Sequence, residues 1–214
     1  MSDAHTQVHL VRHGEVDNPE GILYGRLPGY VLSERGRQMA DCLAAHFADA
    51  DIATVIASPL ERARETATPI AAALGLAVGR DDRLIEAENY FEGMTFGVGD
   101  GSLKQPRHWA QLVNPFRPSW GEPYVAQARR VLAAVGDARW AAAGREAVLV
   151  SHQSPIWAVR NLLEGRHLYH DPRRRQCSLA SVTTLEYDGD RLVSVGYSEP
   201  CKHLLPEHAG PPGA

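Results

Sequence analysis

The amino-acid sequence predicts an α/β fold, a single-domain three-layer α/β/α sandwich whose mostly parallel sheet has an antiparallel edge. Apolar strand-like runs alternate with helical patterns, which is typical of a parallel α/β sheet. These runs cover residues 8–11, 54–57 and 147–150. Two further runs of alternating polarity, at 181–187 and 191–197, flank the turn dipeptide Asp188-Gly189 and predict a hairpin. The hairpin would supply the antiparallel edge.

Size and composition predict one large domain. The 214 residues, of which 44% are hydrophobic and 22% charged, are enough for a sizeable core. We expect a catalytic domain at 1–205 and a flexible C-terminal tail at 206–214, because that stretch, PEHAGPPGA, is rich in proline and glycine. The region 89–123, with several glycines and aromatic residues, is expected to form a lid.

Charge and hydropathy argue against several kinds of partner. A formal net charge of −4 gives no overall attraction to nucleic acid or to an anionic membrane. No run approaches the roughly 18 apolar residues of a membrane span. We therefore expect a cytoplasmic protein that binds neither nucleic acid nor a membrane. Whether the chain forms a homo-oligomer stays open. The basic run at 173–175 is expected on the solvated surface. Cys42, Cys177 and Cys201 lack close spacing, which favours reduced thiols.

Polar residues follow the first strand, in the stretch LVRHG. A strand covered on both faces reads as a continuous apolar run, so polar residues appear where it meets solvent or ligand. Arg12, His13 and Gly14 occupy that place. In open α/β sheets ligands bind beyond the carboxyl ends of the strands. These residues are therefore candidates for a functional site.

A second polar stretch, ASPLERARETA, follows the run at 54–57. Ser58 and Glu61 are spaced as a capping box, with Pro59 at the expected first helical position. This start would place Arg62 in the first helical turn, where backbone N–H groups already favour an anion.

A third stretch, SHQSP, repeats this arrangement after the run at 147–150. His152 stands at the junction between strand and helix, and Ser154 with Pro155 predicts the cap and first turn of that helix. A further helix is expected to begin after Ser33, again as its cap.

Two arginines and two histidines at strand ends suit phosphoryl chemistry. The guanidinium fork matches phosphate oxygens, and neutral imidazole is a competent nucleophile toward phosphorus. A leaving alkoxide would need a proton from a carboxylic acid. The stretch RLIEAENYFEG at 83–93 offers Glu86, Glu88 and Glu92.

Three segments together resemble one known family. RHGE at 12–15, SPLERARET at 58–66 and SHQSP at 151–155, in this order, resemble the histidine phosphatase superfamily, which includes the phosphoglycerate mutases. The resemblance covers residues 8 to about 160 and implies a phosphoglycerate mutase-like fold.

The resemblance also implies roles for individual residues. His13 would be the nucleophile that becomes phosphorylated, while Arg12, Arg62 and His152 would bind the phosphoryl oxygens. Glu86 is the expected proton donor, since the family's donor lies on a Leu-x-Glu segment. Neither a metal ion nor an organic cofactor is implied.

Some positions depart from the family pattern or stay open. Many relatives carry an asparagine where this chain has Pro19, and Asn18 precedes it. Tyr24 and Arg26 lie in a loop that lines the site in relatives, and we expect both to contact substrate. Glu88 stays the alternative proton donor.

The expected function is that of a histidine acid-type phosphatase, a metal-independent phosphomonoester hydrolase. It would act through a phosphohistidine on a small phosphorylated metabolite. A phosphoglycerate mutase-type phosphotransferase is the main alternative, although the glutamate segment does not look like the mutase version. A catalytically weak member that binds a phospholigand or phosphoprotein is the other.

Overall fold

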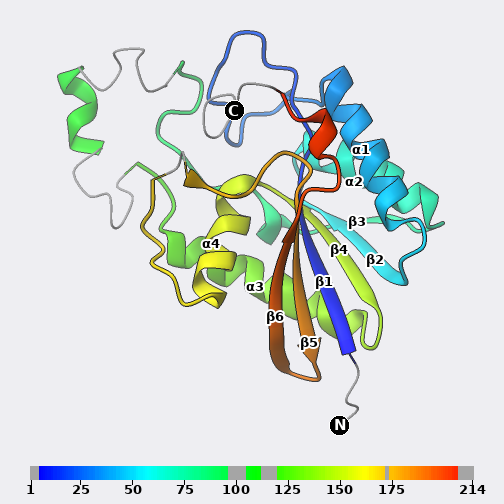
Figure 1. Cartoon of the computed structure of the whole chain (residues 1–214). Helices are drawn as coiled ribbons and strands as arrows, with labels where there is room; N and C mark the ends of the chain where they lie inside the picture. The colour runs from blue at the N-terminus through cyan, green and yellow to red at the C-terminus, as the bar shows by residue number, and fades with distance from the viewer. Residues whose placement is uncertain (1–4, 96–104, 112–119, 172–173, 207–214) are drawn as a thin grey trace.

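The computed structural model describes residues 5–95, 105–111, 120–171 and 174–206. Within these residues a six-stranded sheet lies between two pairs of helices (Figure 1). Much of the expected lid at 89–123, Arg173 of the basic run, and the expected tail beyond Pro206 lie outside the described residues.

The strands follow the order β3-β2-β4-β1-β5-β6. β1, β2, β3 and β4 pair in parallel, whereas β5 and β6 pair antiparallel. Their bounds are His5–Arg12 (β1), Ile52–Ala57 (β2), Val78–Arg80 (β3), Glu146–Ser151 (β4), Val182–Asp188 (β5) and Arg191–Ser198 (β6). The predicted mixed sheet is therefore confirmed. The sequence did not predict β3, whose three residues are too few to show a period.

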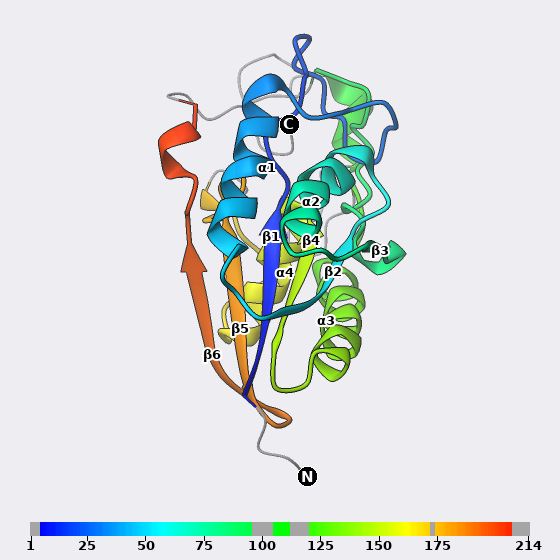
Figure 2. The same ribbon diagram turned by 90° about the vertical axis from the view of Figure 1, so that its right-hand side faces the viewer.

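Helices cover both faces of the sheet (Figures 1 and 2). α1 (Glu34–Phe47) and α2 (Glu61–Ala73) pack on one face. α3 (Tyr124–Ala141) and α4 (Gln153–Leu163) pack on the other. Short 3₁₀ helices span Asp82–Leu84, Pro106–Gln111 and Lys202–Leu204. Among the described helices, none combines the length and the apolar character needed to cross a membrane.

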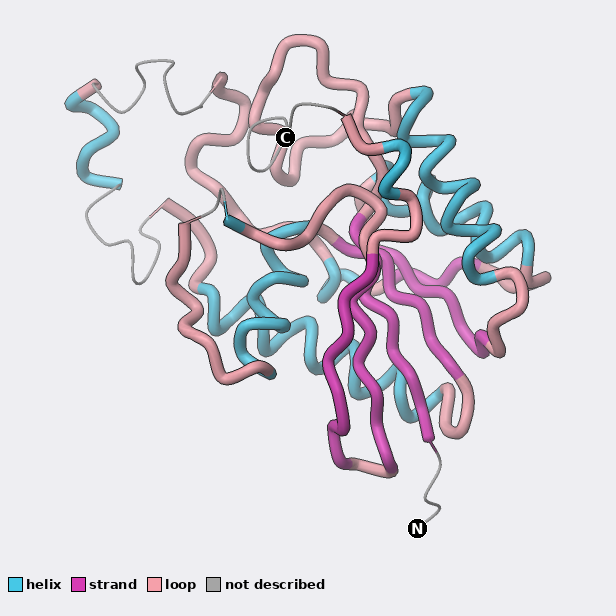
Figure 3. Tube along the Cα trace, in the orientation of Figure 1, coloured by secondary structure: helices cyan, strands magenta, loops and turns pink. Residues whose placement is uncertain are grey.

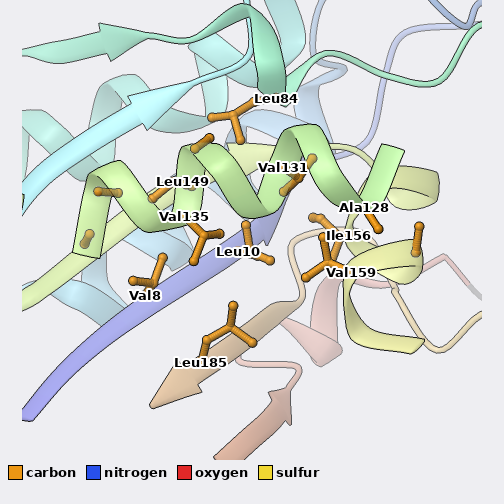
Figure 4. Close-up of a cluster of buried hydrophobic side chains, with 14 of the residues drawn as sticks. Val8, Leu10, Leu84, Ala128, Val131, Val135, Leu149, Ile156, Val159 and Leu185 are labelled. Atoms are coloured by element: carbon orange, nitrogen blue, oxygen red, sulfur yellow. The ribbon is translucent and has the colours of Figure 1, made fainter. Parts of the chain in front are cut away.

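Successive residues of the central strands enter different hydrophobic clusters. Leu10 packs beneath α3 and α4, whereas its neighbour Val11 packs beneath α1 and α2. Leu149 and Val150 of β4 divide in the same way. Figure 4 shows the first cluster, with Val131 of α3 above the sheet. Burial of both faces explains the continuous apolar runs and confirms the three-layer sandwich.

The predicted cap of α1 is confirmed, but that of α2 is wrong. Ser33 Oγ accepts a hydrogen bond from the backbone N–H of Gly36 at 3.0 Å. α2 instead begins after Leu60, which makes no side-chain cap. The hydroxyl of Ser58 lies 2.7 Å from His152 Nε2, so a partner distant in sequence takes the place of the helix N–H groups.

The predicted cap of α4 is also wrong. This helix begins at Gln153, and His152 itself occupies the N-cap position without a side-chain cap bond. Ser154 lies in the first turn and donates from Oγ to Gln127 Oε1 of α3 at 2.9 Å. The Ser154 hydroxyl therefore forms a hydrogen bond between α4 and α3 instead of capping α4.

A disulfide joins Cys42 of α1 to Cys201, which corrects the expectation of reduced thiols. The two Cα atoms lie 6.0 Å apart although 159 positions separate the residues in the sequence. Chain spacing could not reveal this pair, because it forms only when the segment after β6 packs beside α1. Cys177 is a buried free thiol.

Candidate active site

The carboxyl ends of β1 and β4 bring two histidines together. These strands are neighbours, and Arg12 pairs with Ser151 in their register. His13 follows Arg12, and its backbone N–H donates to the Ser151 carbonyl at 3.1 Å. His152 follows Ser151, and the two imidazole centroids lie 5.1 Å apart. Figure 3 shows loops gathered at this end of the sheet.

His13 is held as a neutral imidazole. Its Nδ1 donates to the Gly14 carbonyl at 2.8 Å, which leaves the lone pair on Nε2. Burial, followed by the charges of Arg62 and Arg12, holds the pKa of His13 well below its usual 6.5. A buried imidazole with a free lone pair on a defined nitrogen is suited to nucleophilic attack.

Gly14 is required by the close approach of α1. A Cβ atom at this position would lie 2.6 Å from the Gly36 carbonyl oxygen. The backbone N–H of Gly14 donates to Thr66 Oγ1 at 3.1 Å, and Thr66 in turn donates to the Arg62 carbonyl at 2.8 Å. Thr66 thus ties the loop after β1 to α2.

Two arginines enter the site from β1 and α2. Arg12 Nη1 donates to the Cys177 carbonyl at 2.7 Å. Arg62 is fully buried, donates from Nη2 to the Gly25 carbonyl at 2.6 Å, and stacks over the Tyr24 ring at 4.6 Å. Tyr24 therefore supports Arg62 in this structure, and each guanidinium is fixed by one carbonyl.

Several buried donors around His13 have no acceptor among the described residues. They are Arg12 Nε, Arg62 Nε and Nη1, and His152 Nδ1. Buried N–H groups are nearly always hydrogen-bonded in folded proteins. The oxygens of a phosphoryl group match such a set, since arginine N–H groups bind phosphate strongly. The residues present therefore fit an anionic ligand.

His152 is oriented by a chain of hydrogen bonds. The backbone N–H of Leu60 reaches Ser58 Oγ at 3.4 Å, and this hydroxyl lies 2.7 Å from His152 Nε2. When Ser58 donates its proton to Nε2, the His152 proton resides on Nδ1, the nitrogen without a partner. Burial, with the charges of Arg62 and His13, lowers the pKa of His152 well below 6.5.

The structure separates the two candidate proton donors. Glu86 Oε1 accepts a hydrogen bond from the Ala87 N–H at 2.8 Å, and the carboxyl is near enough for its charge to act on Arg62 and on Tyr24. Glu88 points outward, with 69% of its side chain exposed, and pairs with Arg26 Nη1 at 2.8 Å. Position therefore favours Glu86.

Arg26 and Asn18 are already engaged by protein groups. Arg26 pairs with Glu88 and, from Nη2, with Glu122 at 3.1 Å. The side-chain amide of Asn18 donates to the Ile22 carbonyl and accepts from the Ile22 N–H. Asn18 thus closes its own loop.

Arg175 turns inward, contrary to the surface position expected from the sequence. Its Nε donates to His170 Nε2 at 2.8 Å, and Nη1 lies 3.4 Å from Gln153 Oε1. Gln153 Nε2 lies 3.4 Å from the Cys177 carbonyl, which also accepts from Arg12. Arg175 is therefore linked to Arg12 through two polar groups, the Gln153 side chain and the Cys177 carbonyl.

Sequence reasoning missed the site roles of Ser58 and Thr66. Both lie in the SPLERARET segment and both are buried, Ser58 between β2 and α2 and Thr66 within α2. Polar residues at buried positions of that segment were the available signal. Arg175 carried no signal, because an arginine run is usually solvated.

Comparison with known proteins assigns the chain to one family. The model of the histidine phosphatase superfamily (branch 1) matches residues 8–200. The Mycobacterium tuberculosis protein Rv0525 is 62% identical over 195 residues, which cover 91% of this chain and 96% of that protein. Phosphoserine phosphatase 1 of Hydrogenobacter thermophilus is 33% identical over 162 residues, with 73% and 75% covered.

A solved structure extends the likeness to the fold. Mycobacterial glucosyl-3-phosphoglycerate phosphatase Rv2419c matches with a TM-score of 0.69 at 27% identity, over 85% of this chain and 90% of that one. Family and relatives together support a phosphatase or mutase activity. The chain belongs to branch 1 of the histidine phosphatase superfamily and has its phosphoglycerate mutase-like fold.

Proposed function

We propose that residues 1–205 form a metal-independent phosphomonoester hydrolase that acts through a phosphohistidine at His13. The observation that carries this proposal is the neutral, buried His13 ring, with its Nε2 lone pair free, among arginine N–H groups that lack acceptors. A nucleophile and an anion site in one place suit stepwise phosphoryl transfer.

In the first step His13 Nε2 attacks phosphorus. The new N–P bond forms as the ester P–O bond breaks, and the electron pair leaves with the ester oxygen. Glu86 donates a proton to that oxygen. The Nδ1–H bond to the Gly14 carbonyl stabilises the charge that develops on the ring. Arg12, Arg62 and His152 bind the phosphoryl oxygens, a contribution that is strongest in the transition state.

In the second step water attacks the phosphohistidine. Glu86, now a carboxylate, takes the proton of the water as the O–P bond forms and the N–P bond breaks. Inorganic phosphate leaves and His13 recovers its lone pair. General acid–base help of this kind contributes about 10²- to 10⁴-fold in rate.

We infer that the substrate is a small phosphorylated metabolite, with phosphorylated acids as the first candidates. The relatives named for phosphoserine and glucosyl-3-phosphoglycerate support this order. Arg175 supports it too. Within the described part of the chain, its guanidinium hydrogen-bonds only neutral groups and lies near enough for its charge and that of Arg12 to interact. It could meet a carboxylate of the substrate.

The test is phosphate release from a panel of phosphomonoesters in the presence of a chelator. We expect release by the wild type, none by His13→Ala, and normal release by His46→Ala, which alters an exposed histidine of α1. Quenching in alkaline detergent, in which the N–P bond is stable, should trap a phosphoryl group on the wild-type protein and none on His13→Ala. Melting curves check that His13→Ala is folded.

Other outcomes would overturn the proposal. Interconversion of 2- and 3-phosphoglycerate that outruns phosphate release would identify a mutase. Release that survives the loss of His13 would exclude the phosphohistidine, and release that a chelator abolishes would exclude a metal-independent enzyme. Thermal protection by phosphoesters without turnover would indicate a binding protein.

A further inference from the structure

The segment that carries Glu86 has little regular structure of its own. The 3₁₀ helix Asp82–Leu84 ends just before it, and no strand includes residues 85–88. A carboxyl group on such a segment keeps its position only if the backbone is held from outside. The carbonyl groups of this segment are bound by other elements.

Four carbonyl oxygens between Arg83 and Glu88 accept hydrogen bonds from groups outside the segment. The donors are Arg130 Nη1 to Arg83 O (2.6 Å), Ser151 Oγ to Leu84 O (2.7 Å), Arg26 Nε to Glu86 O (2.7 Å) and Glu122 N to Glu88 O (3.3 Å). The bond from Arg26 falls on the carbonyl of Glu86 itself.

Glu122 joins the two arginines of this set. Arg130 holds the Glu122 carboxylate with two parallel bonds, from Nε at 2.8 Å and from Nη2 at 2.9 Å. Arg26 Nη2 reaches the same carboxylate at 3.1 Å. The Glu122 side chain is 14% exposed, so solvent screens these pairs less than it screens surface pairs. The three side chains form one cluster, which we call the Arg26–Glu122–Arg130 cluster.

The nitrogens of the Arg26 guanidinium are all committed within this arrangement. Nε donates to the Glu86 carbonyl, Nη1 pairs with Glu88 and Nη2 pairs with Glu122. A guanidinium whose three nitrogens all bind protein groups is less suited to bind a substrate anion than one with unpaired nitrogens. The loop of Arg26 also supplies Gly25, whose carbonyl holds Arg62.

We propose that Arg26 is a positioning residue, which fixes the proton donor Glu86 relative to the phosphoryl site and is itself held by Glu122 and Arg130. This inference rests on the proposed phosphatase mechanism. The loop that contains Gly25 and Arg26 then supports both Arg62, which binds the phosphoryl group, and the backbone of the proton donor Glu86. Glu88 contributes as a partner of Arg26 and is not the donor.

The experiment compares two substrates that differ in their need for an acid. Glycerol phosphate has an alkoxide leaving group and requires protonation, whereas p-nitrophenyl phosphate has a good leaving group and does not. We expect Arg26→Gln to lower kcat for glycerol phosphate by about 10-fold or more, with kcat for p-nitrophenyl phosphate within about 2-fold of wild type. Glu86→Gln should lower kcat for glycerol phosphate more strongly than Arg26→Gln does, again with a smaller effect on kcat for p-nitrophenyl phosphate.

Further variants separate positioning from other roles. Glu122→Gln should act in the same direction as Arg26→Gln, since it releases the guanidinium. Arg26→Lys should not restore the rate, because one ammonium group cannot replace the fork. The ratio of kcat for glycerol phosphate to kcat for p-nitrophenyl phosphate is the readout that a merely structural loss would not move. Arg145→Gln is the matched control, because the Arg145 side chain pairs with Asp51 at the start of β4 and β2, at the opposite end of the sheet from Glu86.

Three results would overturn the inference. An equal loss on both substrates with a lower melting temperature would make Arg26 a structural residue only. A raised KM for phosphorylated acids, with unchanged kcat on glycerol phosphate, would make Arg26 a substrate-binding residue. Unchanged kinetics would exclude both roles. Failure of the proposed function itself would appear separately, as phosphate release that does not depend on His13.

Discussion

The rings of His13 and His152 lie 5.1 Å apart between centroids, tilted by 60°, at the ends of adjacent parallel strands. Burial and the charge of Arg62 lower the pKa of both rings well below 6.5. Neither ring carries a carboxylate partner in the described structure, unlike His9, which contacts Glu146 at 2.7 Å. Two neutral histidines can therefore stand side by side without repulsion.

These lowered pKa values predict the pH response of the site. We expect the His13 and His152 resonances to remain those of neutral imidazole as pH falls through 6.5, the ordinary value. NMR titration of histidine-labelled protein measures this, and titration of either ring near 6.5 would contradict it.

The same shifts predict how stability depends on pH. The folded pKa values lie below the unfolded one, so the unfolded chain binds more protons below pH 6.5. The free energy of unfolding should be fully retained above pH 6.5 and fall as pH decreases below it. Urea unfolding at several pH values measures this slope, and His13→Asn should reduce it.

Arg62 should be irreplaceable by lysine. Lysine lacks the planar fork that here binds the Gly25 carbonyl, stacks on Tyr24 and leaves two donors for the phosphoryl group. We expect Arg62→Lys to lower kcat/KM by about 10²-fold, the effect of losing one preorganised donor. Arg64→Lys, on the exposed side of the same helix, should match wild type in phosphate release. Equal behaviour of the two variants would refute the role of Arg62.

Ser58→Ala should affect stability and rate together. The variant leaves His152 Nε2 buried without its hydrogen bond, which costs about 1–3 kcal/mol in free energy of unfolding. The ring is then free to adopt the other tautomer, so kcat should fall. Ser178→Ala, which removes a hydroxyl bound to Glu199, should leave kcat unchanged. A Ser58→Ala enzyme with wild-type kcat would show that this hydroxyl does not orient His152.

Arg175→Gln should discriminate between substrates by their charge. We expect a raised KM, by about 10-fold, for phosphoserine or phosphoglycerate, and an unchanged KM for p-nitrophenyl phosphate, because only the acids offer a second anion. Exposed Arg174→Gln is the control. The pKa of His170, lowered to about 4 by burial and by Arg175, should rise in the variant and so report the loss of the cation. Equal KM changes for both substrates would exclude carboxylate recognition.

The Cys42–Cys201 disulfide should stabilise the fold. Reduction with dithiothreitol should lower the free energy of unfolding by about 2–4 kcal/mol, because the bond constrains the unfolded chain. Cys42→Ser should show the lower stability with or without reductant, whereas Cys177→Ser should keep the response to reductant. An oxidised wild type no more stable than the reduced protein would contradict the bond.

Sequence alone determined the class of fold and the edge of the sheet at which the candidate site residues gather. Strand periodicity and strand ends are local properties, so the apolar runs predicted the central strands and placed Arg12, His13 and His152 at or just beyond their ends. The cap at Ser33 was equally predictable, because its partner Gly36 lies three residues away.

Tertiary structure decided the groups that support the site. Ser58 matched a local capping pattern, yet its hydroxyl bonds His152, 94 positions away. The choice of Glu86 over Glu88, the commitment of Arg26 and the Cys42–Cys201 bond depend likewise on segments that meet only in the folded chain. Local patterns describe neighbours along the chain, whereas hydrogen bonds and ion pairs join whichever groups packing of the two hydrophobic clusters brings together.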